Sequence, residues 1–186
     1  MMLKPNMRSQ VLPMPVVLIS TVSKDGVRNA APWGCIMPIL RPLDEILIAS
    51  WLKRDTLDNI RDTSEFVVNI PSVDMVEVVE ICAKSFPPEA DEFEEADLLP
   101  RPSVKVKPPG IDGCIAWMEC KLVEEILREK YSLIVGKVVH LEGNDSFFDE
   151  RGGMDFESAK PMSMILGPDG VCYTHPAYPG SGREGR

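Results

Sequence analysis

The sequence predicts a mainly β protein, an antiparallel barrel with short helical excursions. Three observations lead to this prediction. At least six apolar, β-branched runs are separated by turn residues, only short stretches show helical spacing, and a new strand pattern follows each of them. With 186 residues, the chain is long enough to bury the core of one domain. We expect a single domain over residues 1–186, with its core over about residues 10–175.

The first strands come from the N-terminal part of the chain. Residues Pro15–Val22 are rich in β-branched side chains, and the turn-forming tetrapeptide Ser23–Gly26 follows them, which predicts a hairpin. The chain then returns over residues 27–39, where two prolines and a glycine interrupt any regular ladder. A third strand is predicted over Glu45–Trp51.

Helical patterns are confined to the middle of the chain. Residues 55–63 place apolar side chains on one helical face, and a fourth strand is predicted over residues 65–71. Residues 72–85 follow a second helical pattern, with Ser72 as a candidate N-cap. Residues 86–113 are rich in proline and charge. We expect an excursion around a short helix there rather than a domain linker, because strands resume directly after it.

The last third returns to strand patterns. Two long strands are predicted over residues 114–143, joined near Arg128–Lys130, because alternating polar and apolar side chains indicate half-buried strands. The chain is turn-rich from residue 149 onward, with one brief strand at residues 170–175. We expect residues 176–186 to form a flexible tail.

Composition excludes several classes of protein. The formal net charge of −9 argues against a general nucleic-acid binder, which needs a basic face against phosphates. Five cysteines without a C-x-x-C pair, together with only two histidines, argue against a zinc site and give no metal-ligating residues. The N-terminal apolar run is short and broken by prolines, so we expect neither a signal peptide nor a membrane span, and we expect a cytoplasmic protein.

Acidic side chains cluster between Glu89 and Asp97, where they are nearly unopposed by cations. The simpler interpretation is a solvated acidic surface. The alternative is a docking patch for a redox protein partner, since complementary charge speeds the encounter of two such proteins.

A basic turn separates the third strand from the first helix and predicts an anion site. The strand ends near Ser50, Lys53 and Arg54 follow it, and the helix starts near Asp55. The first N–H groups of a helix lack intrahelical partners and carry the positive end of the dipole, and arginine suits bidentate phosphate contacts. With hydroxyls at Ser50 and Thr56, the segment suits a phosphate monoester. The alternative is that Asp55 caps the helix and the two cations are ordinary surface residues.

The segment RNAAPWGCIMP at residues 28–38 predicts a slot for a planar ring. Small residues lie beside a large aromatic, and prolines leave backbone N–H and C=O groups that no ladder can use. Such a stretch offers packing to a ring face and hydrogen bonds to its edge. A bulged core strand with a buried tryptophan is the alternative. Together the slot and the anion site indicate a phosphorylated planar cofactor. Neither G-x-G-x-x-G after a strand nor a P-loop is present, which argues against those nucleotide sites.

Six segments in order resemble the flavin reductase-like family, the FMN-binding split β-barrels that include flavoredoxins and NAD(P)H:flavin oxidoreductases. They are PVVLISTVSKDGVRNAAPWG, SWLKRDTLDNI, EFVVNIP, DEFEEADLL, MECKL and YSLIVGKVVHLEG. The likeness covers roughly residues 10–175 and rests on the order and spacing of the segments. It implies a Greek-key antiparallel split barrel and a homodimer that binds two FMN molecules near the subunit interface.

The resemblance also implies which residues bind the cofactor. The residues expected along the flavin ring are Asn29, Ala30, Ala31, Pro32 and Trp33. The residues expected around the ribityl phosphate are Ser50, Trp51, Lys53, Arg54, Asp55, Thr56 and Asn59. The family passes a hydride from NADH or NADPH to the flavin without an obligatory protein acid or base, so we expect no catalytic residue in the chain itself. The alternatives are a flavoredoxin-type electron carrier that serves protein partners and a barrel that binds a ligand without redox turnover.

A few further residues have two interpretations each. His140 could reach the flavin or a substrate, or it could be an ordinary histidine of the barrel. His175, near the turn-rich C-terminus, could have a role at the flavin pocket or none. Cys82 could have a redox role, but core packing is the simpler interpretation. Lys84 and Ser85 could contact the flavin or a pyridine nucleotide.

Overall fold

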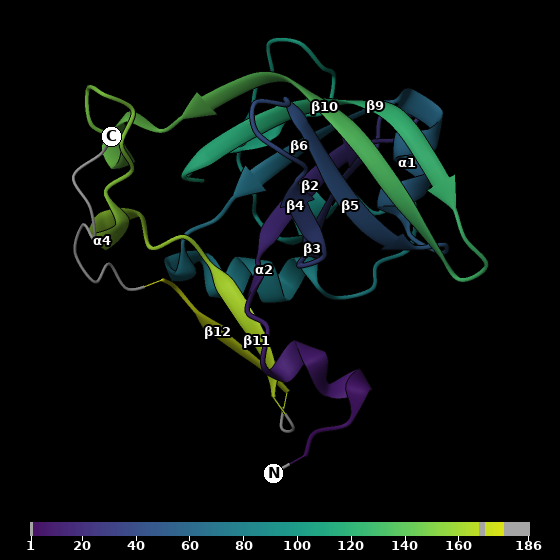
Figure 1. Cartoon of the computed structure of the whole chain (residues 1–186). Coiled ribbons are helices and arrows are strands. Elements are labelled where there is room, and N and C mark those ends of the chain that lie inside the picture. Colours follow the sequence, from purple (N-terminus) through teal and green to yellow (C-terminus); the bar gives the residue numbers. More distant parts are fainter. Residues whose placement is uncertain (1, 168–169, 177–186) are drawn as a thin grey trace.

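The main sheet of the protein has seven antiparallel strands in the order β3-β2-β6-β9-β10-β5-β4 (Figure 1). This computed structural model describes residues 2–167 and 170–176. The strands of the main sheet are β2 (Val17–Val22), β3 (Arg28–Trp33), β4 (Ile36–Pro38), β5 (Glu45–Trp51), β6 (Glu65–Ile70), β9 (Ala116–Leu127) and β10 (Tyr131–Gly143). Every strand predicted for residues 15–143 is found, and the mainly β prediction is confirmed.

The main sheet curls into a half-barrel. Strands β3 and β4 lie at opposite ends of the hydrogen-bonded order, yet only Gly34 and Cys35 separate them along the chain. The two edges of the sheet must therefore approach each other. The Ala49 N–H, which donates to the Cys35 carbonyl at 2.9 Å, fixes the connection to β5. The split-barrel prediction is confirmed, and the meeting edges create the concave region described below.

Two helical segments cover the sheet as the sequence predicts. Helix α1 (Asp55–Thr63) joins β5 to β6 and buries Leu57 and Ile60. A 3₁₀ turn η2 (Val73–Met75) leads into α2 (Val76–Cys82), and the Ser72 hydroxyl accepts the Asp74 N–H as expected of an N-cap. The short helix expected within residues 86–113 is α3 (Glu92–Glu95).

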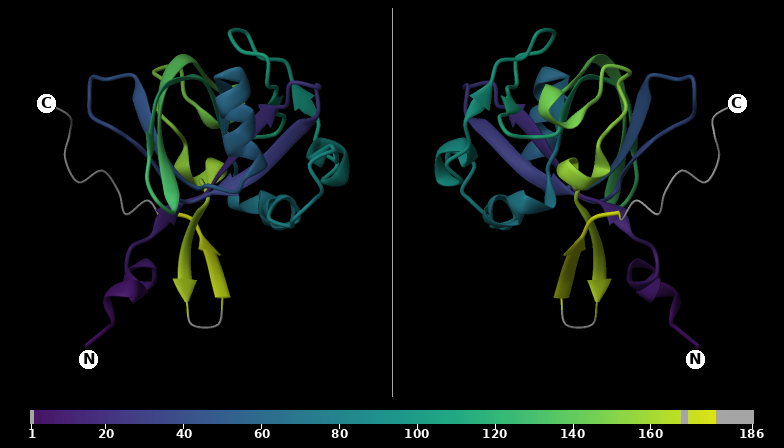
Figure 2. Two further views of the ribbon diagram at one scale, coloured as in Figure 1. Left: turned by 90° about the vertical axis from the view of Figure 1, so that its right-hand side faces the viewer. Right: turned by 90° about the vertical axis from the view of Figure 1, so that its left-hand side faces the viewer.

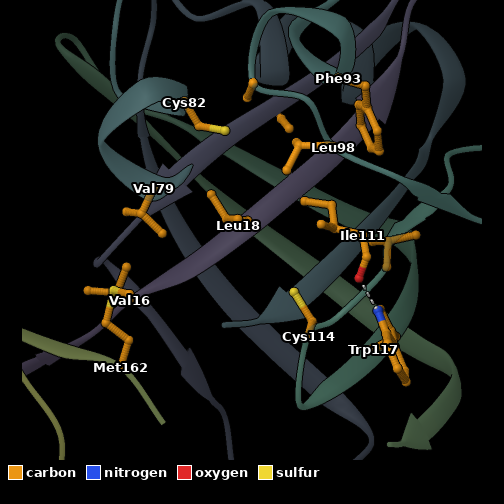
Figure 3. Close-up of a cluster of buried hydrophobic side chains, with 13 residues drawn as sticks. Val16, Leu18, Val79, Cys82, Phe93, Leu98, Ile111, Cys114, Trp117 and Met162 are labelled. Atoms are coloured by element: carbon orange, nitrogen blue, oxygen red, sulfur yellow. Dashed lines mark hydrogen bonds between the residues drawn. The ribbon is translucent and has the colours of Figure 1, made fainter. Parts of the chain in front are cut away.

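Strand β2 separates two apolar clusters, because its successive side chains point to opposite faces. Leu18 packs with Val79, Phe93 and Trp117 beneath α2 and α3, as Figure 3 shows. Ile19 belongs to the other cluster, which fills the barrel and includes the side chains Ile48, Leu57, Phe66 and Ile134. The Trp117 Nε1–H is satisfied by the Ile111 carbonyl at 2.8 Å.

A smaller sheet extends from the barrel. Strands β1 (Met14–Pro15), β11 (Ser163–Gly167) and β12 (Gly170–Thr174) form it, and Figure 2 shows the β11–β12 hairpin projecting beside the N-terminal segment. Strand β12 confirms the brief strand predicted at residues 170–175, whereas β1 and β11 were not predicted. The tail expected over residues 176–186 lies outside the described residues from residue 177 onward.

The remaining elements are short. They are η1 (Pro5–Gln10), β7 (Pro100–Arg101), β8 (Gly110–Ile111), η3 (Asp145–Phe147) and α4 (Phe156–Ala159). Over the described part of the chain, no helix has the length and hydropathy needed to span a membrane.

Candidate functional site

A cleft of about 430 Å³ lies where three segments meet. These segments are β3 with its connection to β4, the turn between β5 and α1, and the chain at the end of α2. The volume is in the range of sites for small organic ligands. The lining residues are Asn29, Ala31, Pro32, Trp33, Gly34, Cys35, Ala49, Trp51, Lys53, Arg54, Asp55, Thr56, Cys82, Ala83, Lys84, Ser85, Phe86 and Glu92.

One wall of the cleft is the edge strand β3. Because β3 pairs only with β2 in the sheet, its other edge is free of ladder bonds. Ala31, Pro32 and Trp33 contribute a largely apolar surface. Trp33 Nε1 is buried and, among the described residues, is the only such side-chain nitrogen or oxygen without a hydrogen-bond partner. This wall therefore presents a largely apolar face, and the unpartnered Trp33 Nε1–H is buried behind that face.

The opposite wall is the turn that begins α1. Lys53 and Arg54 are exposed, and neither is in an ion pair with any residue that the structure describes. Arg54 occupies the N-cap position with extended backbone angles, and no side chain caps the helix. The proposal that Asp55 caps α1 is therefore wrong, because Asp55 is already the first helical residue. The uncapped N–H groups and the two free cations together favour an anion here.

A buried polar network supports Asn29 at the edge of the cleft. The Thr56 hydroxyl donates to Asn29 Oδ1 at 2.8 Å, and Asn59 Nδ2 donates to the Thr21 hydroxyl at 3.0 Å. The Thr21 hydroxyl donates in turn to Asn29 Oδ1 at 3.4 Å. The network links β2, β3 and α1, so it fixes the two walls relative to each other.

Three of the residues predicted to bind the cofactor do not line the cleft. Ala30 is buried beneath α2 and α3, and its N–H donates to the Glu92 carboxylate at 2.8 Å. Ser50 is buried and its hydroxyl donates to the Trp51 carbonyl at 2.8 Å. Asn59 is buried in the polar network. The structure brings the other predicted residues together at the cleft: Asn29, Ala31, Pro32, Trp33, Trp51, Lys53, Arg54, Asp55 and Thr56.

The end of α2 forms the third side of the cleft. Cys82, Lys84 and Ser85 line it. Burial raises the pKa of the Cys82 thiol to about 12, so this thiol stays protonated and packs as a small apolar side chain. The two histidines do not line the cleft. His140 lies on β10, where Nε2 is 3.3 Å from the Glu142 carboxylate, and His175 is exposed after β12.

Sequence reasoning missed Glu92, which it placed among solvated acidic residues. Glu92 is only 7% exposed and lines the cleft. Burial raises the pKa of its carboxyl to about 7, and the charges of Asp55 and Asp91 act in the same direction. A signal was present in DEFEEA, because an Asp91 N-cap starts a helical turn that buries positions 92, 93 and 96 on one face.

The chain matches known families and relatives over most of its length. Residues 7–161 match the model of the flavin reductase like domain. An uncharacterized protein of Methanothermobacter thermautotrophicus is 51% identical over 172 residues, which cover 89% of this chain and 81% of that protein. An uncharacterized protein of Aquifex aeolicus is 34% identical, with 84% and 83% covered.

Solved structures of similar fold come from redox proteins. Nitrilotriacetate monooxygenase component B from Bacillus cereus is 25% identical with a TM-score of 0.83, over 96% of this chain and 97% of that one. Flavoredoxin of Desulfovibrio vulgaris (Miyazaki F) is 18% identical with a TM-score of 0.85, over 100% of both chains. At 18% identity, the similarity to this flavoredoxin shows a shared fold.

Proposed function

This chain belongs to the flavin reductase-like family, and we propose that it is an FMN-binding oxidoreductase that uses NADH or NADPH to reduce the flavin held in the cleft. The observation that carries the proposal is the convergence on one cleft of the apolar β3 edge and the uncapped, cationic start of α1. Such a pair of walls fits a planar ring that carries a phosphate. The family membership supports a flavin as that ring.

The residues present fit FMN in three ways. The edge of β3 that pairs with no other strand offers backbone hydrogen-bonding groups beside the apolar wall. Lys53, Arg54 and the first N–H groups of α1 would hold the phosphate. Asn29, fixed by the polar network, would line the cleft beside the ring edge. Bound FMN would supply the hydride acceptor, so the protein's own task is to bind, orient and shield.

A second copy of the chain is part of the proposal. An apolar groove of about 400 Å³ adjoins the cleft and shares Gly34, Cys35 and Ala49 with it. The groove continues along β4 to Met37, whose side chain is 55% exposed, and Leu40 and Leu43 beyond it are also exposed. Exposed apolar surface of this kind favours an interface, and a homodimer would place the cleft at its margin. The expected cytoplasmic location remains part of the proposal.

The phosphate assignment is tested with the double variant Lys53→Ala/Arg54→Ala. We expect FMN affinity to fall about 10- to 100-fold, the worth of one charge-assisted hydrogen bond after screening by solvent. Affinity is measured by the quenching of flavin fluorescence on binding. Thr56 is left intact because its hydroxyl supports Asn29. The control is Lys105→Ala/Lys107→Ala, which removes two exposed cations outside the cleft. Equal affinity in both variants would contradict the assignment.

A flavoredoxin-type electron carrier is the second candidate. The exposed carboxylates Glu89, Glu94 and Glu95 lie on and before α3, the helix whose Glu92 lines the cleft, and favour docking of a basic redox protein. Anaerobic mixing with NADH or NADPH separates the two functions. Rapid bleaching of the flavin supports a reductase, whereas bleaching that needs a partner protein supports a carrier.

A further inference from the structure

Glu92 lies in a wall between two clefts. A second cleft, of about 550 Å³, adjoins the first on the far side of this wall. Both clefts are lined by the same three polar residues, Asn29, Asp55 and Glu92, which come from β3, α1 and α3. The second cleft is also lined by the exposed residues Asp25 and Glu89, so it reaches solvent. The buried residue Glu92 thus lines both the cofactor cleft and a solvent-connected acidic cleft.

The hydrogen bonds of Glu92 are made to neutral donors. The Ala30 N–H donates to Oε2 at 2.8 Å, and the Asn29 amide also acts as a hydrogen-bond donor to the carboxylate. The only nearby cation of β3, Arg28, is bonded instead to Asp91 at 2.7 Å, and lies 3.5 Å from Glu94. No residue that the structure describes forms an ion pair with Glu92.

The titratable groups that act on the pKa of Glu92 are acidic or neutral, although Lys53, Arg54 and Lys84 line the same cleft without an ion pair to it. Asp55 faces it from α1, Asp91 from its own helix and the protonated Cys82 thiol from α2. Burial and the two carboxylates raise the pKa of Glu92 to about 7, so the carboxyl is poised to exchange a proton near neutral pH.

We propose that Glu92 is a redox-linked proton acceptor, which takes a proton from water in the second cleft when negative charge arrives in the cofactor cleft. The inference rests on the proposed function. A hydride from a reduced nicotinamide brings two electrons and one proton, so the occupant of the cleft gains one negative charge. That charge makes the neighbouring carboxylate less stable and its protonated form more stable. Glu92–COO⁻ and one H₃O⁺ of the solvent become Glu92–COOH and H₂O, so one hydronium O–H bond breaks as the carboxyl O–H bond forms, and no other covalent bond of the protein changes.

Infrared difference spectroscopy tests the proposal on the FMN-loaded protein. The reduced-minus-oxidised spectrum, with dithionite as reductant at pH 7.5, should gain the C=O stretch of a protonated carboxylic acid. The variant Glu92→Gln keeps an acceptor for the Ala30 N–H and should lose this band, and its proton uptake per flavin reduced should fall by up to one. The control Glu95→Gln removes an exposed carboxylate from the same helix and should keep the band. A band that survives in Glu92→Gln, or that is absent from the wild type, would overturn the proposal.

A second measurement needs no flavin. In the flavin-free protein labelled with ¹³C at the glutamate carboxyl carbons, the resonance that Glu92→Gln removes should titrate near pH 7. A midpoint in the ordinary glutamate range would overturn the inference while leaving flavin binding untouched. Failure of FMN to bind, with the titration near pH 7 intact, would instead overturn the proposed function and with it the redox link.

Discussion

Some residues of the cleft could be predicted from the local sequence, whereas the positions of others depend on tertiary packing. Lys53, Arg54 and Trp33 were found from local signals, because a basic turn before a helix and a proline-broken strand are visible over a few residues. Glu92 was missed because its burial depends on α3 docking against β3, which sequence spacing does not show. Ser50 was assigned to the phosphate, but β5 turns its side chain inward, where its hydroxyl meets the Trp51 carbonyl.

The raised pKa of Glu92 predicts a pH-dependent stability. The folded-state pKa of about 7 lies above the ordinary 4.5, so folding favours the protonated carboxyl. This contribution is complete below about pH 4.5 and is lost as the pH rises through 7. In the Glu92→Gln variant, residue 92 does not titrate, so its contribution to stability does not vary with pH. The free energy of unfolding of the wild type should therefore fall relative to the variant by about 3 kcal/mol between pH 4.5 and pH 8.

Urea unfolding at pH 4.5, 6 and 8 measures this difference. Glu95→Gln serves as the control, since its side chain is exposed and should give a difference that is nearly independent of pH. A constant difference between wild type and Glu92→Gln across the range would show that the carboxyl titrates alike in the folded and unfolded chain.

At the level of elements, strand prediction succeeded where the local pattern is strong and failed where pairing is distant. Strands β2, β5, β6, β9 and β10 have β-branched or alternating sequences. Strand β1 has only two residues, one of them proline, and exists because it pairs with β11 across most of the chain. Strand β11 lacks β-branched side chains except Ile165. Such pairings are set by tertiary context, which no short window contains.

An arginine adds a partly exposed contact between α3 and the barrel to the buried contacts of Glu92 and Phe93. Arg28 on β3 bonds the Asp91 carboxylate at 2.7 Å and lies over the Phe93 ring, 5.3 Å from its centroid. We expect Arg28→Ala to cost only about 1 to 2 kcal/mol of global stability, because the pair is partly exposed, but to loosen α3 locally. Amide hydrogen exchange over residues 91–98 should become faster than in the wild type.

The matched control is Arg61→Ala, which breaks an ion pair between α1 and β9, with Glu125 at 2.6 Å. It should leave exchange over residues 91–98 unchanged. If both variants speed exchange there equally, α3 is not held by Arg28 in particular.

At the scale of the whole molecule, the half-barrel carries an apolar groove at one edge of its sheet. The sheet ends at β4 beside the apolar groove, while its other edge, β3, borders the cleft. The curled sheet was predictable from the order of strands and turns. The position of the groove was not, because it depends on how closely the two sheet edges approach.

The proposed homodimer predicts an effect of charge in this groove. Met37→Glu should shift the protein from dimer to monomer, because a carboxylate buried in an apolar interface is costly to desolvate. Light scattering after size-exclusion chromatography measures the mass. Val104→Glu is the control, as Val104 is similarly exposed at 63% but lies outside the groove. A wild-type monomer, or a Met37→Glu dimer, would contradict the interface.

The two-residue link between β3 and β4 has one more consequence, for chemical labelling. Cys35 lies in this link, is exposed and lines both the cleft and the groove, whereas Cys82, Cys114 and Cys120 are buried. The rate at which a thiol reagent labels Cys35 Sγ therefore depends on the accessibility of both the cleft and the groove. Exposed Cys172 on the projecting hairpin gives an internal reference. Slower labelling of Cys35 than of Cys172 would report the binding of FMN when FMN is added, and self-association when the protein concentration is raised.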